Sequence, residues 1–389
     1  MIIYLIWFFV SVLICYTTLQ SNRKTQNRII LLYLLALGVF VGLSDMLGGY
    51  DRYIYAELYD GMADFNRAGG NPWTSFSFEF YGSEFGYGTF CALLSYITCN
   101  RYIFIFIATM VIYLLLIRSL TKYVDNAPFA VVMFMGLWVF FTFTYLRQVM
   151  AATIVWLAFE YIIKRDWKRF LLVWFIAYSF HNSALIFLPM YYIPVRKFSQ
   201  TQVLIVMAAA LAIGLTSLPQ SLFATYADMT EVRAGRARYD ADYGFRWAYL
   251  MEAAFFLYVI LRNYRNIRNE AKDLVMLNTA LIFCAILLVF VRSENGGRMG
   301  WFFMIGVMCT LSNICIKNKK ILSQGVLMIV VSLLLYYRIL TGWGTLLSPY
   351  KAFLTNGYRQ KDYIHEYYEY DPKYDEDKFY RPALWFMEY

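Results

Sequence analysis

Long apolar stretches, separated by short polar segments, recur along almost the whole chain. A membrane-spanning helix needs about 20 apolar residues, and ten stretches come close to that length. They cover residues 2–19, 28–47, 102–120, 127–144, 146–163, 202–218, 246–262, 274–291, 298–316 and 321–340. The alternating segments of a β-barrel, roughly ten residues each, do not occur. The pattern therefore predicts an all-α polytopic membrane protein with about 10 transmembrane helices.

Residues 168–193 do not fit a simple span. Two short apolar pieces flank His181-Asn182-Ser183, and Pro189 weakens the second piece as a helix. Two half-helices of about eleven residues would enter and leave the membrane on the same side. The alternative is one full span, which would place Arg196 and Lys197 outside and invert every later basic cluster. We favour the re-entrant half-helix pair.

The orientation of the spans follows from lysine and arginine, which concentrate in cytoplasmic loops. Six basic clusters lie between apolar stretches, and placing all six in the cytoplasm leaves both termini outside. The clusters are Arg23/Lys24/Arg28, Arg118/Lys122, Lys164/Arg165/Lys168/Arg169, Arg196/Lys197, Arg262/Arg265/Arg268 and Lys317/Lys319/Lys320.

This topology defines a single polytopic transmembrane domain, residues 1–340, and an outward-facing tail, residues 341–389, that is rich in tyrosine and acidic residues. Two outer loops interrupt the transmembrane domain, at residues 48–100 and 219–245. The first loop has many turn residues and few apolar runs. It is too long for a plain connector, so we expect it to have a function.

The composition agrees with a membrane protein and excludes several other classes. Of the 389 residues, 60% are hydrophobic and 16% are charged, whereas about a quarter are charged in soluble proteins. The net charge of +9 comes from the basic clusters and does not indicate nucleic-acid binding. The six cysteines include no CxxC pair and predict neither a metal site nor a disulfide framework. Only Cys91 and Cys99 could meet outside the membrane.

Arg147 stands inside a nearly unbroken apolar run from Phe129 to Phe159. A cation in hydrocarbon costs about 2.5–3.5 kcal/mol on insertion scales, so it normally faces a cavity or a partner. A turn at Thr144-Tyr145 divides the run into two helices and places Arg147 near the outer end of the second one. The alternative is a helix-end arginine that extends to the lipid headgroups.

Two further arginines, Arg292 and Arg298, flank a short outer turn in which Gly296-Gly297 allows close backbone approach. A guanidinium group matches phosphate oxygens bidentately. Arg147, Arg298 and Arg292 therefore predict a phosphate site at the outer membrane face. Simple helix-end roles stay open for Arg298 and Arg292, and Arg298 could also pair with Glu294.

Three other residues are candidates for catalysis on the same side. His181 sits at the tip of the predicted hairpin, and Asp51 and Glu84 lie in the first outer loop. Either carboxylate could take a proton from an attacking hydroxyl. The plainer alternatives are a buried or capping histidine, and loop carboxylates that are solvated or paired with Arg52.

Motifs of other chemistries are missing or weak. The chain has no P-loop, no GxSxG and no HExxH sequence, and its two histidines exclude a His-rich metal site. The segments Asp240-Ala-Asp242 and Asp375-Glu-Asp377 resemble the DxD motif of nucleotide-sugar transferases, but two carboxylates without context occur by chance. We therefore expect no metal and no other cofactor.

The order of these motifs resembles that of the EpsG-like, Wzy-type polysaccharide polymerases of bacteria. The resemblance covers roughly residues 1–355 and is most specific in its RQ-x-x-A and FH-x-SAL pieces. The matching segments are Gly49-Tyr-Asp51-Arg-Tyr-Ile-Tyr55, Glu84-Phe-Gly-Tyr87, Tyr145-Leu-Arg147-Gln148-Val-Met-Ala151, Ala177-Tyr-Ser-Phe-His181-Asn-Ser-Ala184-Leu185, Gly297-Arg298-Met-Gly-Trp-Phe302 and Ser348-Pro349-Tyr350.

The resemblance implies a GT-C-like glycosyltransferase in the bacterial inner membrane, with its active site facing the periplasm or exterior. Such an enzyme polymerises undecaprenyl-pyrophosphate-linked oligosaccharide repeat units, which are both donor and acceptor, into O-antigen, capsule or exopolysaccharide. Arg147 and Arg298 would bind the pyrophosphate, assisted by Arg292. Glu84 would be the base, because its segment follows the family's motif more closely than the segment of Asp51 does. His181 would contact the phosphate or orient the acceptor. Further partners would be membrane lipid and a chain-length regulator protein, but no nucleic acid.

Three other functions remain alternatives. An O-antigen ligase would use the same lipid donor but a finished core as acceptor. A lipid-linked oligosaccharide flippase or exporter would use a similar basic cavity without catalysis, but it predicts paired repeats, which we do not detect. A transferase with a monosaccharide phospholipid donor would show acidic motifs and a metal.

Overall fold

The computed structural model describes residues 1–45, 50–222, 244–293, 296–348, 350–355 and 377–384. Within these ranges the chain is mostly helical. The one sheet there is a short antiparallel hairpin of β1 (Ile316–Lys317) and β2 (Lys320–Ile321). The prediction of an all-α membrane protein is confirmed at this level.

Six helical stretches in the described part of the chain are long and apolar enough to cross a membrane. They are α2 (Arg23–Gly42), α6 (Arg101–Tyr123), α8 (Leu146–Trp156) with most of α9 (Phe159–Lys164), α15 (Ala271–Val289), α16 (Gly296–Met299) with η6 (Gly300–Phe303) and α17 (Met304–Cys315), and α18 (Ser323–Gly342). Shorter helices in the same bundle are α1 (Ile2–Thr18), α7 (Ala127–Leu137), α11 (Gln200–Gly214) and α14 (Trp247–Arg262). The number of about ten spans and the GT-C-like arrangement stay predictions.

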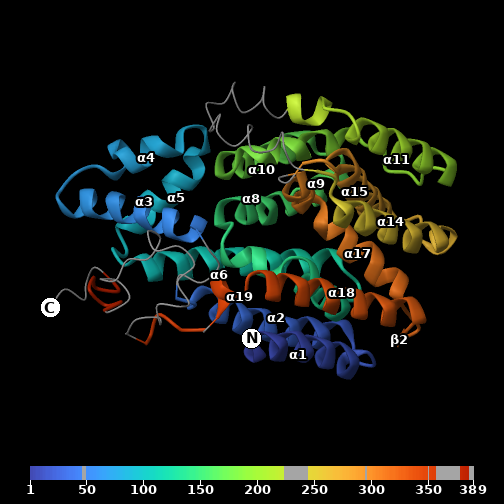
Figure 1. Ribbon diagram of the computed structural model, residues 1–389, viewed down its shortest axis with the longest axis horizontal. Helices are drawn as coiled ribbons and strands as arrows, with labels where there is room; N and C mark the ends of the chain where they lie inside the picture. Colours follow the sequence, from blue (N-terminus) through green and yellow to red (C-terminus); the bar gives the residue numbers. More distant parts are fainter. Residues whose placement is uncertain (46–49, 223–243, 294–295, 349, 356–376, 385–389) are drawn as a thin grey trace.

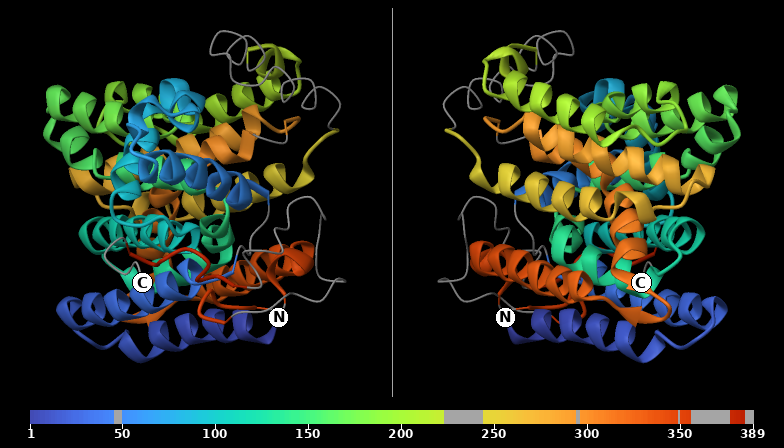
Figure 2. Two further views of the ribbon diagram at one scale, coloured as in Figure 1. Left: turned by 90° about the vertical axis from the view of Figure 1, so that its left-hand side faces the viewer. Right: turned by 90° about the vertical axis from the view of Figure 1, so that its right-hand side faces the viewer.

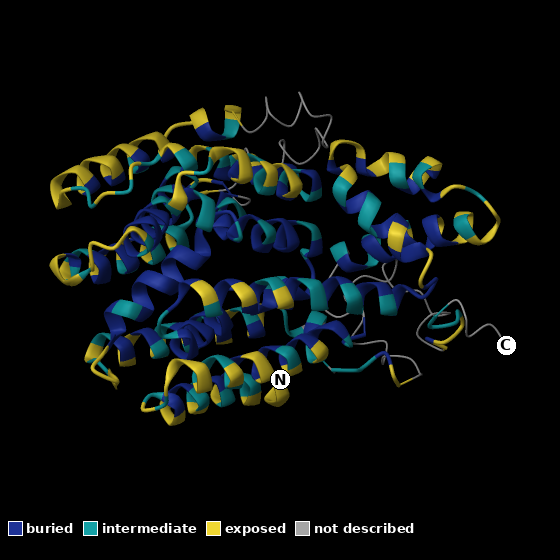
Figure 3. Cartoon of the chain, turned by 180° about the vertical axis from the view of Figure 1, so that it is seen from behind, coloured by how far each residue is buried: buried dark blue, intermediate teal, exposed yellow. Residues whose placement is uncertain are grey.

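Most of these helices run roughly side by side along the long axis of the molecule (Figure 1). The helices α1, α2, α6 and α18 form one side, and α10, α11, α14 and α15 form the other, with α17 between them (Figures 1 and 2). Buried residues fill the middle, whereas exposed residues line the outer helices (Figure 3). Leu13, Leu204 and Leu334 are each more than half exposed. Such apolar outer faces suit a lipid environment.

The predicted span at residues 127–144 is not one helix. α7 ends at Leu137, Trp138 leaves the helical conformation with a φ of −140°, and the 3-10 helix η3 (Val139–Phe143) follows. The indole of Trp138 is fully buried, with its ring centre 4.9 Å from that of Trp156 on α8. Packing of two large rings accompanies this break, which no local sequence signal marks. The turn predicted at Thr144-Tyr145 is present and starts α8 just before Arg147.

The segment predicted as a hairpin does turn back on itself. Its arms are α10 (Trp167–Phe180) and the 3-10 helix η4 (Asn182–Tyr192), with His181 between them. Arg165, just before the first arm, donates to Tyr191 O at 2.6 Å and to Ile193 O at 2.9 Å at the end of the second arm. Both ends of the hairpin therefore lie together.

The predicted outer loop at residues 48–100 contains several helices that the sequence analysis did not predict. The described part of this segment folds into α3 (Tyr50–Arg67), η1 (Pro72–Thr74), α4 (Phe76–Tyr81), η2 (Gly82–Glu84) and α5 (Phe85–Ser95). The buried face of α3 holds Tyr55, Ala56, Tyr59, Met62 and Ala63. These positions have helical spacing, but the polar residues between them and the nearby glycines hid the pattern. We call this segment the α3–α5 unit.

All six basic clusters gather at one end of the molecule, which we call the β end because it carries β1 and β2. Lys122 pairs with Glu160, which also accepts from Lys164 at 2.6 Å. Lys197 Nζ donates to Ile267 O at 2.5 Å, and Lys319 Nζ donates to Gln20 O at 2.9 Å. These contacts link the clusters at one end of the molecule, and their placement in the cytoplasm stays a prediction.

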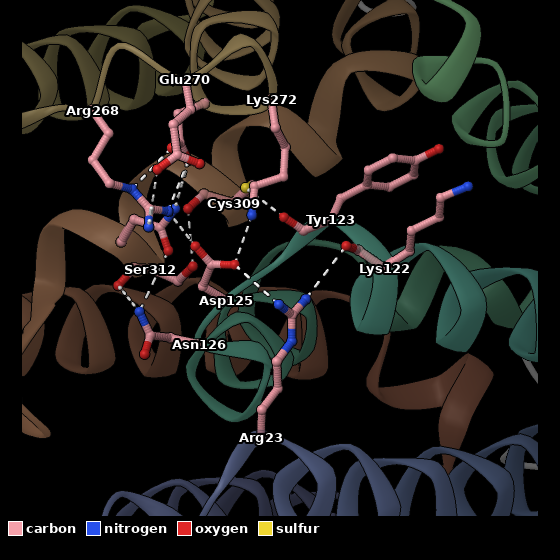
Figure 4. Close-up of polar contacts among 12 residues, drawn as sticks. Arg23, Lys122, Tyr123, Asp125, Asn126, Arg268, Glu270, Lys272, Cys309 and Ser312 are labelled. Atoms are coloured by element: carbon pink, nitrogen blue, oxygen red, sulfur yellow. Dashed lines mark hydrogen bonds and ion pairs between the residues drawn. The ribbon is translucent and has the colours of Figure 1, made fainter. Parts of the chain in front are cut away.

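Asp125 is the centre of the polar network at the β end (Figure 4). It accepts hydrogen bonds from Arg268 and, at 2.7 Å, from Lys272, and Arg23 lies 3.6 Å away. Burial alone would raise the pKa of Asp125, but the bonds from Lys272 and Arg268 bring it below its usual value. This carboxylate joins α2, the α6–α7 turn and the start of α15.

The C-terminal residues 377–384 pack at the opposite end, against the α3–α5 unit. Lys378 Nζ lies 3.0 Å from Asp45 Oδ2, and both side chains are fully buried. Asn100 Nδ2 donates to Lys378 O at 2.9 Å and to Arg381 O at 3.0 Å, and Arg381 donates to Asp64 at 2.8 Å. This part of the predicted tail therefore belongs to the folded body, while residues 356–376 lie outside the described ranges.

The buried Asp45–Lys378 pair gives a stability prediction. Asp45→Ala leaves the ammonium group of Lys378 buried without its carboxylate, so we expect a loss of about 3–5 kcal/mol in the free energy of unfolding. A double variant, Asp45→Leu with Lys378→Met, removes both charges and should regain most of this loss. Melting temperatures in detergent measure both effects. Equal losses in the single and double variants would contradict the ion-pair interpretation.

Candidate active site

Glu84 lies at the junction between α4 and α5, inside the protein. Gly82 has a φ of +51°, which suits glycine, and it turns the chain sharply after α4. The single turn of η2 then carries Glu84 inward, where only 7% of the residue is exposed. The local backbone therefore buries a carboxylate that the sequence placed in an outer loop.

Arg147, in the first turn of α8, supplies the opposite charge. Its Nη1 pairs with Glu84 Oε2. The guanidinium carbon lies 5.2 Å from the centre of the Tyr55 ring and 5.8 Å from that of Tyr81, within the range of cation–π attraction. Arg147 thus has the anionic partner that a cation within an apolar run requires.

The tip of the hairpin contacts the second oxygen of the same carboxylate. The backbone N–H of Asn182 donates to Glu84 Oε1 at 3.1 Å, and Asn182 Nδ2 donates to Ser83 Oγ at 2.8 Å. Three segments far apart in the sequence therefore meet at Glu84: the α3–α5 unit, the start of α8 and the hairpin tip. Figure 1 shows the left ends of α8 and α10 next to that unit.

His181 is a neutral imidazole with one nitrogen available. Its Nδ1 accepts a hydrogen bond from Ser183 N at 3.1 Å, and because a backbone N–H can only donate, the ring proton lies on Nε2. Burial lowers the pKa of His181 from 6.5 to about 4, although Glu84 opposes the shift. The Nε2–H group makes no hydrogen bond with any residue that the structure describes, so it can donate to a ligand oxygen.

Arg298 lies beside the start of α8. Its Nη2 donates to Tyr145 Oη at 2.8 Å, and its guanidinium stacks 4.1 Å from the centre of the Tyr145 ring. Gln148 Nε2 donates to Arg298 O at 3.2 Å, which fixes the backbone there. No carboxylate in the described ranges forms an ion pair with Arg298. This arginine keeps capacity for an anionic ligand.

Asp51 belongs to the same cluster, and Arg292 does not. Asp51 lies in the first turn of α3 and acts electrostatically on both Tyr55 and His181. Arg292 is exposed and donates to Leu215 O at 3.0 Å, just beyond α11. Its predicted assisting role stays a prediction. The acidic residues of the weaker sequence candidates, Glu294, Asp240, Asp242 and Asp375, lie outside the described residues.

Tyr145, Asn182 and Tyr55 contribute to the site, although no role was predicted for them from the sequence. Each lies within one of the sequence segments that match the resemblance, and this position was the only sequence signal for a role in the site. Burial raises the pKa of Tyr55 to about 12, so its hydroxyl stays protonated and can donate. Cys91 and Cys99, the candidate disulfide pair, are both free.

Comparison with known proteins finds one protein family that matches this chain. Residues 27–352 match the model of the EpsG family. No curated protein and no solved structure matches the chain. The matched range includes Glu84, Arg147, His181 and Arg298, so the cluster lies entirely within the shared part of the chain.

The neutral state of His181 makes stability depend on pH. Its pKa is 6.5 in the unfolded chain and about 4 in the folded protein, so the unfolded state binds the extra proton between these values. The stabilisation is complete above the unfolded pKa and is lost as pH falls through the folded one. The loss is on the order of 2 kcal/mol, discounted for the partial exposure of the ring.

Melting temperatures of the protein above, within and below this pH window measure the effect, with His181→Asn as the matched variant. We expect a smaller fall with acidification in His181→Asn than in the unmodified protein. Glu84, Asp51, Arg147 and Arg298 act electrostatically on the ring and remain in both proteins, so the comparison isolates the effect of His181. Equal falls would show that His181 is not the group that titrates.

Proposed function

This chain belongs to the EpsG family, and from that premise we propose that it is a polysaccharide polymerase. It would join oligosaccharide repeat units carried on undecaprenyl pyrophosphate. The growing glycan would move from its lipid pyrophosphate to a hydroxyl of a new lipid-linked unit. Donor and acceptor would thus be the same class of molecule.

The convergence of Glu84, Arg147 and His181 carries this proposal. Transfer of a sugar from a pyrophosphate needs a group that accepts the proton of the attacking hydroxyl. It also needs donors that stabilise the charge on the leaving oxygen. Glu84 is a buried carboxylate. His181 Nε2–H is a donor in the same cluster, and so is Arg298, which has no carboxylate partner in the described ranges.

The proposed step balances as follows. The acceptor hydroxyl oxygen attacks the anomeric carbon of the growing chain and forms the new C–O bond, while its proton moves to a Glu84 oxygen. The bond between the anomeric carbon and the pyrophosphate oxygen breaks, and its electron pair leaves with the lipid pyrophosphate. Arg147 holds Glu84 in place, and His181 Nε2–H donates to a sugar or phosphate oxygen. No cofactor is required, because pyrophosphate is already a good leaving group.

The basic β end supports an orientation for this reaction. Lysine and arginine concentrate on the cytoplasmic side of membrane proteins. With the β end in the cytoplasm, the α3–α5 unit and Glu84 would face the periplasm or exterior of a bacterial inner membrane. Lipid-linked repeat units present their sugars on that side.

Variants of Glu84 and Arg147 test the function. We expect Glu84→Gln and Arg147→Lys to lower the rate of polymerisation by about 10²–10³, because each removes a charged contact at the reacting groups. Surface polysaccharide on a gel should then show single repeat units in place of a ladder. Glu79→Gln, on the exposed side of the neighbouring α4, is the matched control and should give a normal ladder.

A normal ladder from both site variants would remove the assigned roles. The same gel separates the alternatives. A flippase needs no proton acceptor, so Glu84→Gln would not reduce the supply of units to the outside. A ligase variant would leave finished polymer that is not attached to its core.

A further inference from the structure

A cavity of about 510 Å³ lies at the β end, beside the network around Asp125 (Figure 4). Its volume falls within the usual range for small-molecule sites, about 300–1,000 Å³. The walls come from the α6–α7 turn, the residues that follow α14, the start of α15, the second half of α17 and β1. Because the β end is opposite the α3–α5 unit, this cavity is separate from the candidate active site.

Thr310 places a buried hydroxyl group in the wall of this cavity. Only 5% of the residue is exposed, and its Oγ1 makes no hydrogen bond with any residue that the structure describes. Other helical threonines, such as Thr153 and Thr279, donate to the carbonyl four residues earlier, at 3.1 and 2.7 Å. A buried polar group without a partner is destabilising. The hydroxyl of Thr310 is therefore available to a ligand.

Side-chain amides line the same cavity, and two of them are held only weakly. Asn126 Nδ2 lies 3.4 Å from both Ser312 O and Asn313 Oδ1. Asn313 Nδ2 in turn lies 3.4 Å from Asp273 Oδ1. Hydrogen bonds of this kind are usually about 2.7–3.2 Å long. Both amides can therefore exchange these contacts for shorter ones to a ligand.

The charges in the lining are balanced, and one lysine is left over for a ligand. Asp125 and Asp273 both pair with Arg268. Lys317 is exposed on β1 and forms no ion pair with the part of the chain that the structure describes. The hairpin turn at residues 318–319, where both φ angles are positive at 50° and 59°, holds Lys317 at the opening of the cavity.

The rest of the lining is apolar and, among the described residues, contains no aromatic ring. It consists of Ile267, Met276, Cys309, Ile314, Ile316 and Leu322. Apolar side chains pack on the flat faces of a nucleobase while polar groups read its edge. A carboxamide matches the N6–H and N7 positions of adenine bidentately. A phosphate group alone offers only acceptors, so it would leave the amide oxygens without donors.

We propose that this cavity binds an adenine nucleotide. The base lies among the aliphatic side chains with its polar edge against Asn126, Asn313 and Thr310, and the phosphate lies at Lys317. The proposal rests on the orientation given under the proposed function, because a cytoplasmic β end meets dissolved adenine nucleotides. It adds a ligand that takes no part in the glycosyl transfer.

Binding of AMP to the full-length protein in detergent, measured by calorimetry, tests this site. Adenosine and ribose 5-phosphate serve as partial probes, and both should bind more weakly than AMP. We expect Thr310→Val to weaken AMP and adenosine alike by about three- to tenfold, because each loses one hydrogen bond. This variant removes an unsatisfied hydroxyl at nearly constant size, so its melting temperature should not fall. No measurable binding of AMP by the unmodified protein would overturn the proposal.

Matched variants separate the two ends of the ligand. Thr109 on α6 also has a buried hydroxyl without a partner in the described ranges, but it lies outside the cavity, so Thr109→Val should bind AMP normally. Lys317→Gln should weaken AMP and leave adenosine unchanged. Lys320→Gln, on the other strand of the hairpin and outside the lining, is its control. Unchanged binding of AMP by both Thr310→Val and Lys317→Gln would overturn the assignment.

Competition tests the class of ligand. GMP and UMP should displace AMP only at much higher concentration, and equal displacement by either would overturn the adenine assignment. Equal displacement by inorganic phosphate or phosphatidylglycerol would make this a general phosphate groove and overturn it as well.

The outcome is also separate from that of the proposed function, because AMP binding needs no lipid-linked substrate. Binding of AMP by a protein that lengthens no chains would refute the polymerase and keep the cavity site. Lengthening by a protein that binds no AMP would do the reverse.

Discussion

The ion pair between Glu84 and Arg147 is the interaction on which the site depends. Arg147 starts a helix in a long apolar run, and a charge in such surroundings is tolerated only with a partner. That partner comes from 63 residues earlier in the chain, in the α3–α5 unit. Because Asn182 N–H donates to the other oxygen of Glu84, one carboxylate links three segments of the chain. Loss of either charge would leave the other one buried and uncompensated.

The two ends of the molecule use charge in different ways. At the β end, Asp125 joins several helices through contacts that neutralise its cations within the protein. At the site end, Arg298 stacks on Tyr145 without a carboxylate partner in the described ranges. A network in which the charges are paired stabilises the fold, whereas the guanidinium group of Arg298 keeps a binding capacity for an anion. This contrast is why we assign the chemistry to one end and orientation in the membrane to the other.

Much of the helical framework could be predicted from the sequence, because apolar length is a local property. The ends of α1, α14 and α18 lie within about two residues of the predicted spans, as expected for helix boundaries in general. The hairpin was also predictable, since the basic clusters left no other way to keep one side consistent. The helices of the α3–α5 unit were missed because glycine and polar residues concealed their period. The break at Trp138 depends on packing against Trp156, which comes from another helix.

The site was predicted as a set of residues but not as a geometry. Arg147 was singled out because a cation in an apolar run requires an explanation. Arg298, His181 and Glu84 were singled out because the predicted topology places them on the same outer side. That Arg147 would bind Glu84, leaving Arg298 for a ligand, could not be derived from spacing. Long-range pairing follows from the tertiary fold, and the sequence carries no local signal for it.

The most direct test of the central claim is incubation of the purified protein with a single lipid-linked repeat unit and no other substrate. If the protein is a polymerase, lipid-linked products with two, three and more repeat units appear, and one undecaprenyl pyrophosphate is released for each new linkage. A folded protein that leaves the repeat unit unchanged in length would contradict the account.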